Sequence, residues 1–140
     1  MDNREKGNYG EEQACRFLKK QGVRILTRNF GVRGGEIDLI GYHKGVLLFF
    51  EVKTRSGDSW GTPREAIDAK KMDRISVAAD RFCKQYCKNG KIEVPLFPFL
   101  SGVSLRHSVR TRRIDGVEVF LTREGGLKAI ERVESMRVLE

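Results

Sequence analysis

The segment from residue 34 to residue 55, GGEIDLIGYHKGVLLFFEVKTR, constrains the fold of this chain more than any other. Its apolar, β-branched and aromatic residues are typical of strands, and the GYHKG stretch at residues 41–45 predicts the turn of a hairpin. We therefore expect strands over residues 36–40 and 46–54. Three carboxylates and an ammonium group lie within these strands, among residues that otherwise suit a core.

Side chains two positions apart in a strand point to the same face. Glu36 and Asp38 therefore lie together, as do Glu51 and Lys53. The opposite faces of the two strands hold apolar residues suited to a core: Ile37, Leu39, Leu48, Phe50 and Val52. The alternation thus predicts that each strand carries its charged groups on one side only.

The register of the hairpin decides whether the two charged sets share a face. They do so only if the numbers of paired residues sum to an odd number, because a slip by one residue turns one set to the other face. A two-residue turn at residues 43–44 meets this condition and places Asp38 opposite Phe49 and Glu51 opposite Glu36. Opposite or diagonal partners then have β-carbons roughly 5–8 Å apart, close enough to hold one metal ion.

Three carboxylates this close repel one another, and burial increases the penalty. A divalent cation removes it, and hard oxygen ligands suit Mg²⁺ or Mn²⁺. Lys53 could then orient or deprotonate a water molecule, or neutralise charge that grows on a phosphate. This set of groups is typical of a metal-dependent phosphodiesterase. The spacing leaves an alternative open, in which the same residues form a solvated hairpin face with weak ion pairs.

The rest of the chain predicts further helices and strands around this hairpin. Helical patterns cover residues 4–21 and 62–88, and strand patterns cover residues 23–29, 117–121 and 127–133. In the first helix, Glu11, Ala14 and Leu18 follow the spacing of an inward stripe, so Glu11 is expected to extend the acidic cluster. Residues 91–111 show no clear pattern.

Composition restricts the class of protein. The 140 residues fit one domain, and the 27 basic side chains exceed the 19 acidic ones, for a net charge of +8 that favours a polyanion such as nucleic acid. An ordinary basic surface is the alternative. No apolar run reaches membrane-spanning length, and no secretory signal is present, so we expect no membrane partner. Three cysteines without a signal indicate reduced thiols and a cytoplasmic protein.

Several motifs together resemble one known family. They are G-x-x-G-E-x-x-A at residues 7–14, ILTRNF at 25–30, GGEIDLI at 34–40, FFEVKTR at 49–55, the Gly61-x-Pro63 start of the long helix, the basic pair Lys70-Lys71, and RRIDGVEVF at 112–120. The chain is similar to the YraN-type family of small bacterial proteins, described as predicted endonucleases distantly related to archaeal Holliday junction resolvases. The resemblance covers about residues 1–90 and 112–136.

The resemblance implies an α/β fold of the restriction-endonuclease-like, or PD-(D/E)XK, superfamily, with a mixed central β-sheet flanked by helices. It implies that Asp38 and Glu51 are metal ligands, that Lys53 is catalytic, and that Glu11 and Glu36 support them. It also implies a homodimer, because related resolvases pair to cut two strands. The connection at about residues 91–111 is longer than is usual for the family, which suggests an insertion into a single nuclease-like domain spanning residues 1–140.

Basic side chains outside the acidic cluster are candidates for contact with phosphates. They are Arg28, Arg55, Lys70, Lys71, Arg110 and Arg112. A solvated basic surface is the alternative for each of them. Cys83 and Cys87 lie one helical turn apart, which could suit zinc, although ordinary buried thiols are the favoured interpretation.

The leading hypothesis is a Mg²⁺- or Mn²⁺-dependent endonuclease that acts on DNA, with branched or otherwise structured DNA as the substrate class. The second is a nucleic-acid-binding module that keeps the fold without cutting. The third is an interaction protein whose basic face meets an acidic partner. Divalent-metal titration with a panel of DNA structures separates the first two, and binding that survives on protein but not on DNA would indicate the third.

Overall fold

The computed structural model describes residues 1–57, 69–95 and 102–140. Its helices are α1 (Asn3–Lys20) and α2 (Ala69–Tyr86). Its strands are β1 (Arg24–Val32), β2 (Gly35–His43), β3 (Val46–Ser56), β4 (Lys91–Pro95), β5 (Ser104–Ser108), β6 (Thr111–Leu121) and β7 (Leu127–Leu139). None of the helices in these ranges is long and apolar enough to cross a membrane.

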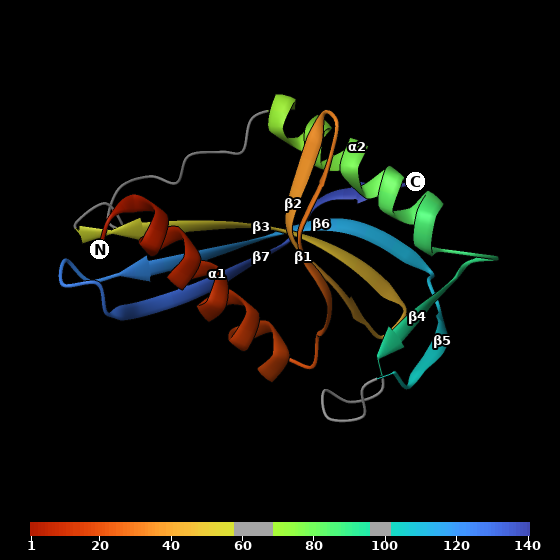
Figure 1. Ribbon diagram of the computed structural model, residues 1–140, viewed down its shortest axis with the longest axis horizontal. Coiled ribbons are helices and arrows are strands. Elements are labelled where there is room, and N and C mark those ends of the chain that lie inside the picture. Colours follow the sequence, from red (N-terminus) through yellow and green to blue (C-terminus); the bar gives the residue numbers. More distant parts are fainter. Residues whose placement is uncertain (58–68, 96–101) are drawn as a thin grey trace.

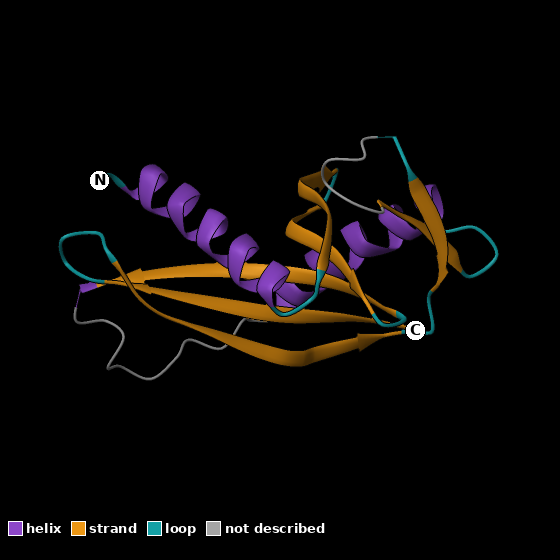
Figure 2. Ribbon diagram, turned by 90° about the horizontal axis from the view of Figure 1, so that it is seen from below, coloured by secondary structure: helices purple, strands orange, loops and turns teal. Residues whose placement is uncertain are grey.

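Five strands form the central sheet in the order β1-β2-β3-β6-β7 (Figure 1). Every neighbouring pair is antiparallel except β3 and β6, which run parallel. Figure 2 shows α1 lying diagonally along the longer strands, while the β1–β2 hairpin curls out of their plane. The predicted mixed α/β sheet flanked by helices is therefore confirmed, and it is compatible with a restriction-endonuclease-like core.

The two helices cover opposite faces of β3, because successive side chains of a strand point to opposite sides. Leu48 and Phe50 pack with Ala14 and Leu18 of α1. Leu47 and Phe49 pack with a second set of buried side chains from α2: Met72, Ile75, Ala78, Ala79, Phe82 and Cys83. Strand β3 is thus buried on both sides, so the charged residues in its second half sit next to two cores.

Helix α1 begins and packs as its sequence predicts. Asp2 caps it by accepting a hydrogen bond from the backbone N–H of Glu5 at 2.8 Å. At Gly10 the helix approaches β3 so closely that a β-carbon would lie 1.9 Å from Thr54 Oγ1. This contact fixes the distance between the N-terminal half of α1 and the end of β3. The predicted start of the second helix at residue 62 lies outside the described residues.

The turn between β2 and β3 differs from the predicted one. It consists of Lys44 and Gly45, both with positive φ (48° and 85°), and His43 pairs with Val46. Positive φ at both central residues is what a two-residue type I′ hairpin turn needs, and glycine at the second position accommodates it readily. The predicted turn at residues 43–44 was therefore wrong by one residue, which shifts the register by two and keeps Leu39 on the face of Leu48 and Phe50. Ile37 was predicted on that same face, but it packs in the core under α2.

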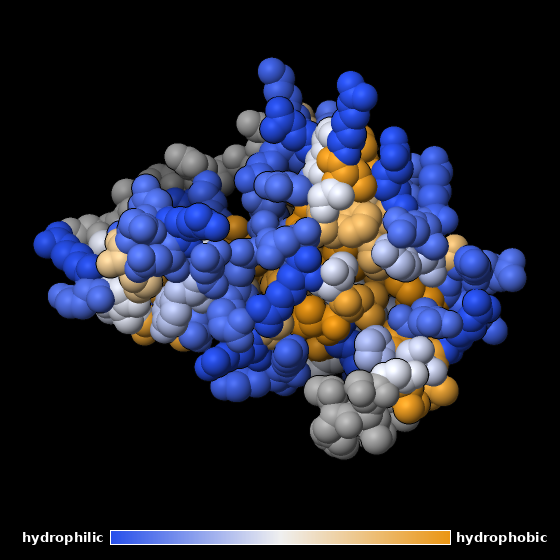
Figure 3. Space-filling model, in the orientation of Figure 1, coloured by the Kyte–Doolittle hydropathy of each residue, from blue (hydrophilic) through white to orange (hydrophobic). Residues whose placement is uncertain are grey.

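The segment that the sequence left without a pattern forms a small sheet of its own, in which β4 pairs with β5. Whether this sheet is an insertion stays a prediction. A hollow of about 440 Å³ lies where β1, α2 and β4 meet, lined in part by Leu26, Phe30, Phe82 and Ile92. Figure 3 shows apolar side chains near the middle of this face, surrounded by hydrophilic ones.

Candidate active site

Asp38 and Glu51 lie side by side where β2 and β3 begin to separate. The backbone pairing of the two strands reaches Leu39 and Phe50, the residues next to them. Beyond that point, the backbone N–H of Val52 donates to Asp38 Oδ2 at 2.8 Å. The Asp38 carboxylate thus accepts a backbone hydrogen bond that the neighbouring strand would otherwise accept. This bond holds the carboxylate next to Val52, the residue between Glu51 and Lys53 in the sequence.

The electrostatic environment of Asp38 is unfavourable to its charge. Burial raises the pKa of Asp38 to about 7, and the neighbouring Glu51 carboxylate adds to the effect. The hydrogen bond from Val52 and the charge of Lys71 act in the opposite direction. A proton shared by the two carboxylates, or a cation bound between them, would relieve this repulsion.

Lys71 of α2 already supplies a positive charge to this pair. Its Nζ forms an ion pair with Glu51 Oε1. The Glu51 side chain is only 11% exposed, whereas that of Lys71 is 54% exposed. The Glu51 carboxylate raises the pKa of Lys71, which is the shift expected for an ammonium next to a carboxylate. Lys71 was predicted to contact nucleic acid, and its pairing with the acidic cluster was not foreseen from the sequence.

Glu11 of α1 faces the same region from the other side of the sheet. Burial raises the pKa of Glu11, and the charges of Asp38 and Glu36 add to this, while Arg28 opposes it. Its Oε1 atom is buried and has no hydrogen-bond partner in the part of the chain that the structure describes. A hollow of about 360 Å³ contains both Glu11 and Asp38 in its wall. The inward orientation predicted from the helical stripe agrees with this placement.

Lys53 and Glu36 take different places around the Asp38–Glu51 pair. Lys53 is half-buried on β3, two positions after Glu51, and it stands in register with Glu118 of β6. Glu36 is exposed and lines a separate hollow with Glu51 and Lys71. The predicted pairing of Glu36 with Glu51 does not occur, because the observed register brings Asp38 to that position.

The groups present suit a hard divalent cation without forming a complete site for it. Within residues 1–57, 69–95 and 102–140, no three acidic, histidine or cysteine side chains gather closely enough to hold a metal ion in this arrangement. Asp38 and Glu51 nevertheless offer adjacent carboxylate oxygens, and the buried Glu11 Oε1 atom accepts no hydrogen bond from the described residues. Oxygen donors of this kind fit Mg²⁺ or Mn²⁺ better than softer metals.

Two of the arginines predicted to bind nucleic acid are engaged with acidic side chains. Arg28 Nη1 lies 2.8 Å from Glu12 Oε2, and its side chain is 40% exposed. Arg55 lies 3.7 Å from Glu118, and both of these side chains are only 10% exposed. The structure thus leaves Arg28 within reach of a ligand and places Arg55 inside the protein.

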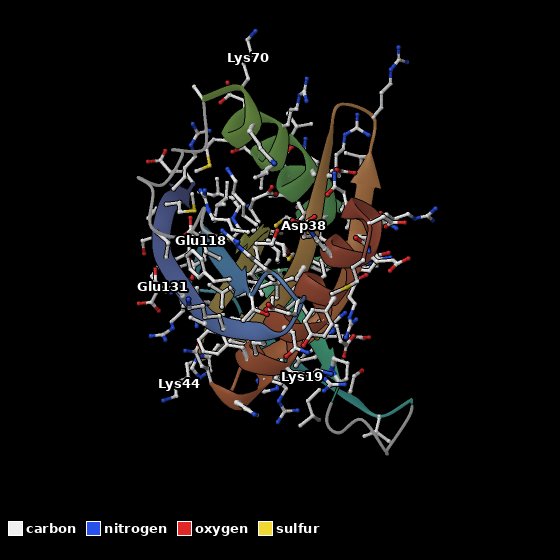
Figure 4. All side chains as sticks on the ribbon, turned by 90° about the vertical axis from the view of Figure 1, so that its left-hand side faces the viewer. Lys19, Asp38, Lys44, Lys70, Glu118 and Glu131 are labelled. Carbon is white, nitrogen blue, oxygen red and sulfur yellow. The ribbon has the colours of Figure 1, made fainter. Side chains whose placement is uncertain are left out.

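The other predicted contacts are spread over both ends of the molecule. Figure 4 looks at the end where α1 begins and shows Asp38 between the two helices, with Lys70 projecting outward from α2. Arg110 donates to the backbone oxygen of Lys44 at 2.6 Å, and Arg112 donates to that of Glu140. β6 pairs with β3 from Val46 onward, five positions before Glu51, so these two arginines lie roughly 16 Å along the strand from the carboxylate pair.

A second charged cluster, centred on Asp115 of β6, was not identified from the sequence. Asp115 is fully buried and accepts hydrogen bonds from Arg113 at 2.9 Å, from Arg132 at 3.0 Å and from the backbone of Ser135 at 2.9 Å. It lies at a bulge in the β6–β7 pairing. Arg132 also donates to Gln21 at the end of α1 at 2.9 Å, so this cluster ties β7 to the helix that carries Glu11.

Cys83 and Cys87 are free thiols, and Cys87 is partly exposed. Cys83 is buried, and burial together with the neighbouring Cys83 raises the pKa of Cys87 to about 12. This placement agrees with the favoured interpretation from the sequence.

Comparison with known proteins gives a consistent result. A profile of the uncharacterised protein family UPF0102 matches residues 10–119. A UPF0102 protein of Pelotomaculum thermopropionicum is 34% identical over 129 residues, which cover 92% of each chain. One of Desulforamulus reducens is 28% identical over 130 residues, again 92% of each chain. One of Symbiobacterium thermophilum is 48% identical over 80 residues, covering 57% of this chain and 68% of the relative. The profile match includes every residue of the predicted acidic cluster.

Proposed function

This chain belongs to the UPF0102 family, as its resemblance to YraN-type proteins predicted, and from that premise we propose that it is a metal-dependent nuclease acting on DNA. The observation that carries the proposal is the Asp38–Glu51 pair beside the half-buried Lys53 of the same strand. The net charge of +8 supports a polyanionic substrate. Branched or otherwise structured DNA is the substrate class that the family resemblance suggests.

Each side chain has a role that follows from its chemistry. Asp38 and Glu51 would hold a Mg²⁺ or Mn²⁺ ion, with Glu11 facing the same hollow. Such an ion supplies Lewis-acid polarisation of a phosphoryl oxygen and lowers the pKa of a bound water molecule. Lys53, whose three N–H donors can reach oxygen atoms of a substrate, would stabilise the negative charge that develops on the phosphate. The Val52 N–H fixes the orientation of Asp38.

The test is cleavage of labelled branched, flapped and single-stranded DNA by the purified protein, with Mg²⁺ or Mn²⁺ and with EDTA. Asp38→Asn and Lys53→Ala should each abolish metal-dependent cleavage. Matched controls on α2 and α1 are Asp80→Asn, whose carboxylate pairs with Lys84 at an exposed position, and Lys19→Ala, also exposed. Cleavage by the Asp38 and Lys53 variants at the wild-type rate would rule out this site.

A binding module without nuclease activity is the second candidate, and one observation favours it. The Lys71 ammonium already neutralises Glu51, so the acidic pair is tolerated without a metal ion. This candidate predicts DNA binding that weakens with salt but no turnover at any concentration of Mg²⁺ or Mn²⁺.

A homodimer, suggested by the family resemblance, is a separate proposal that light scattering on a sizing column would test.

A further inference from the structure

Two glycines of α1, Gly7 and Gly10, lie one turn apart, and packing explains only one of them. A β-carbon at Gly10 would collide with Thr54, so glycine is required there. A β-carbon at Gly7 would have no atom of residues 1–57, 69–95 or 102–140 within 4 Å. Glycine in the middle of a helix lowers its stability relative to alanine. Among the described residues, nothing fills the space above Gly7, and no close approach requires a glycine there.

That space opens onto the 360 Å³ hollow described above, which has a size typical of ligand-binding pockets, roughly 300–1,000 Å³. Its wall comes from one face of α1 and from alternate residues of β3, as the periodicity of each element dictates. The lining residues are Asn3, Lys6, Gly7, Glu11, Asp38, Val52, Thr54 and Ser56. In Figure 1, the first turns of α1 and the end of β3 lie together at the left.

The two ends of this hollow differ in charge. Glu11 and Asp38 form the acidic end. At the other end, Lys6 Nζ donates to Ser56 Oγ at 3.3 Å. Val52, which binds Asp38, and Ser56 are four positions apart on β3, so the ends are separated by roughly 13 Å. An ammonium and hydroxyl groups suit an anion, whereas the carboxylates repel one unless a cation is present.

We propose that the Lys6 end of this hollow binds another phosphate of the cleaved DNA strand, beyond the immediate neighbour of the phosphate that is cleaved, and that Gly7 leaves room for the sugar–phosphate backbone to pass over α1. The inference rests on the proposed function, because it assigns the path of the same substrate. Lys6 and Gly7 are positioning residues here: neither touches the scissile phosphate. Lys6 supplies a charged donor, and Ser56 and Thr54 supply hydroxyl groups.

The first experiment measures binding of a fluorescein-labelled branched DNA in EDTA, which prevents cleavage, at several salt concentrations. Lys6→Gln should weaken binding and reduce the slope of log K against log salt by about 1, as expected for loss of one phosphate contact. The exposed Lys19 of the same helix is the charge-matched control, and Lys19→Gln should change the slope less. Equal slopes for Lys6→Gln and the wild type would overturn the assignment.

The second experiment fills the space above Gly7. Gly7→Leu should weaken DNA binding by about tenfold, equivalent to the loss of about 1.4 kcal/mol. The neighbouring Asn8 is exposed and outside the hollow, so Asn8→Leu is the matched control and should bind like the wild type. Gly7→Ala, a smaller change, should raise the melting temperature while it weakens DNA binding. If Gly7→Leu folds and binds DNA as the wild type does, the inference is wrong.

The two changes should also be non-additive. If Lys6 and Gly7 serve the same phosphate, the double variant should lose less binding than the two single losses combined. Full additivity would contradict a shared site. Binding of inorganic phosphate and of anionic lipid vesicles should be measured with the same variants. If the changes at Lys6 and Gly7 weaken binding of either of these probes but not binding of DNA, the choice of DNA as the ligand is wrong.

These outcomes are separable from failure of the proposed function. In Mg²⁺, Lys6→Gln should raise KM and leave kcat near the wild-type value, whereas Asp38→Asn abolishes turnover. A wild-type protein that never cuts DNA refutes the nuclease proposal and leaves the binding measurements in EDTA intact. A wild-type protein that cuts, with Lys6 and Gly7 variants that match it in KM and affinity, refutes only the further inference.

Discussion

Replacing Lys71 with methionine tests whether its ammonium stands in for a metal ion. Methionine keeps the length and the apolar stem but removes the charge that faces Glu51. Without it, the Asp38 and Glu51 carboxylates repel each other with less compensation. Because the Lys71 side chain is more than half exposed, solvent screens the pair, and we expect the metal-free protein to lose only about 1 kcal/mol of unfolding free energy. For a domain of this size, this corresponds to a melting temperature lower by about 3–4 °C.

Metal binding should change in the opposite direction. A cation that binds Glu51 in the wild type must displace the ammonium or share the carboxylate with it, so removal of Lys71 should tighten Mg²⁺ or Mn²⁺ binding by about fivefold, the equivalent of about 1 kcal/mol. The stabilisation by saturating metal should grow by the same amount through linkage. Isothermal titration calorimetry and thermal unfolding with and without Mn²⁺ measure the two effects independently of catalysis.

Lys70 provides the control, because it lies next to Lys71 on α2, carries the same charge and lines the same hollow as Glu51. Lys70→Met should leave both the melting temperature and the metal affinity close to the wild-type values. If Lys71→Met binds Mn²⁺ no more tightly than Lys70→Met, the ammonium does not compete with the metal. If neither variant nor the wild type binds Mn²⁺, the carboxylate pair is not a metal site.

Three further perturbations follow from the structure. The folded-state pKa of Asp38, about 7, lies above its usual value of 3.8, so the folded state binds the Asp38 proton more tightly than the unfolded state does. Relative to Asp38→Asn, the wild type should therefore lose on the order of 2 kcal/mol of unfolding free energy as the pH rises from 4 to 7. Urea unfolding at several pH values measures this difference, and an equal pH dependence of the two proteins would contradict the burial of the charge. Asp115→Ala leaves Arg132, only 10% exposed, without its carboxylate, and should cost about 3–5 kcal/mol in the same assay, whereas the exposed Glu134→Ala should cost far less. Gly10→Val should force α1 away from Thr54 and lower both the melting temperature and the rate of DNA cleavage, whereas Gly7→Ala should raise the melting temperature. A stable Gly10→Val protein that cleaves at the wild-type rate would show that the helix does not need this close approach.

The central hairpin was predictable because its alternation carries more information than its turn. Charged residues occupy every second position at the start of β2 and in the second half of β3, and the odd-number condition for the pairing held although the turn was placed one residue too early. The inward placement of Glu11 followed from the same kind of periodicity in α1. The proximity of Asp38 and Glu51 could thus be anticipated without knowledge of the exact pairs.

Contacts between distant parts of the chain could not be anticipated in the same way. The ion pair between Lys71 and Glu51 depends on how α2 is positioned along β3, and the periodicity of the two segments does not specify this position. The burial of Arg55 against Glu118 depends on the parallel pairing of β3 with β6, a choice that no local pattern reveals. The pairing of β4 with β5 escaped prediction because prolines and polar residues interrupt the strand pattern there.

The hydrogen bond between Arg132 and Gln21 has a consequence for attempts to shorten the protein. A fragment that ends after β6 would retain the acidic cluster of Asp38 and Glu51 together with Lys53. It would nevertheless expose the outer edge of β6, and the Asp115 carboxylate would lose its hydrogen bonds from Arg132 and from the Ser135 amide. The far end of α1 would lose its anchor at the same time. Removal of β7 should therefore disturb the hollow that contains Glu11 and Asp38, although no residue of β7 lines that hollow.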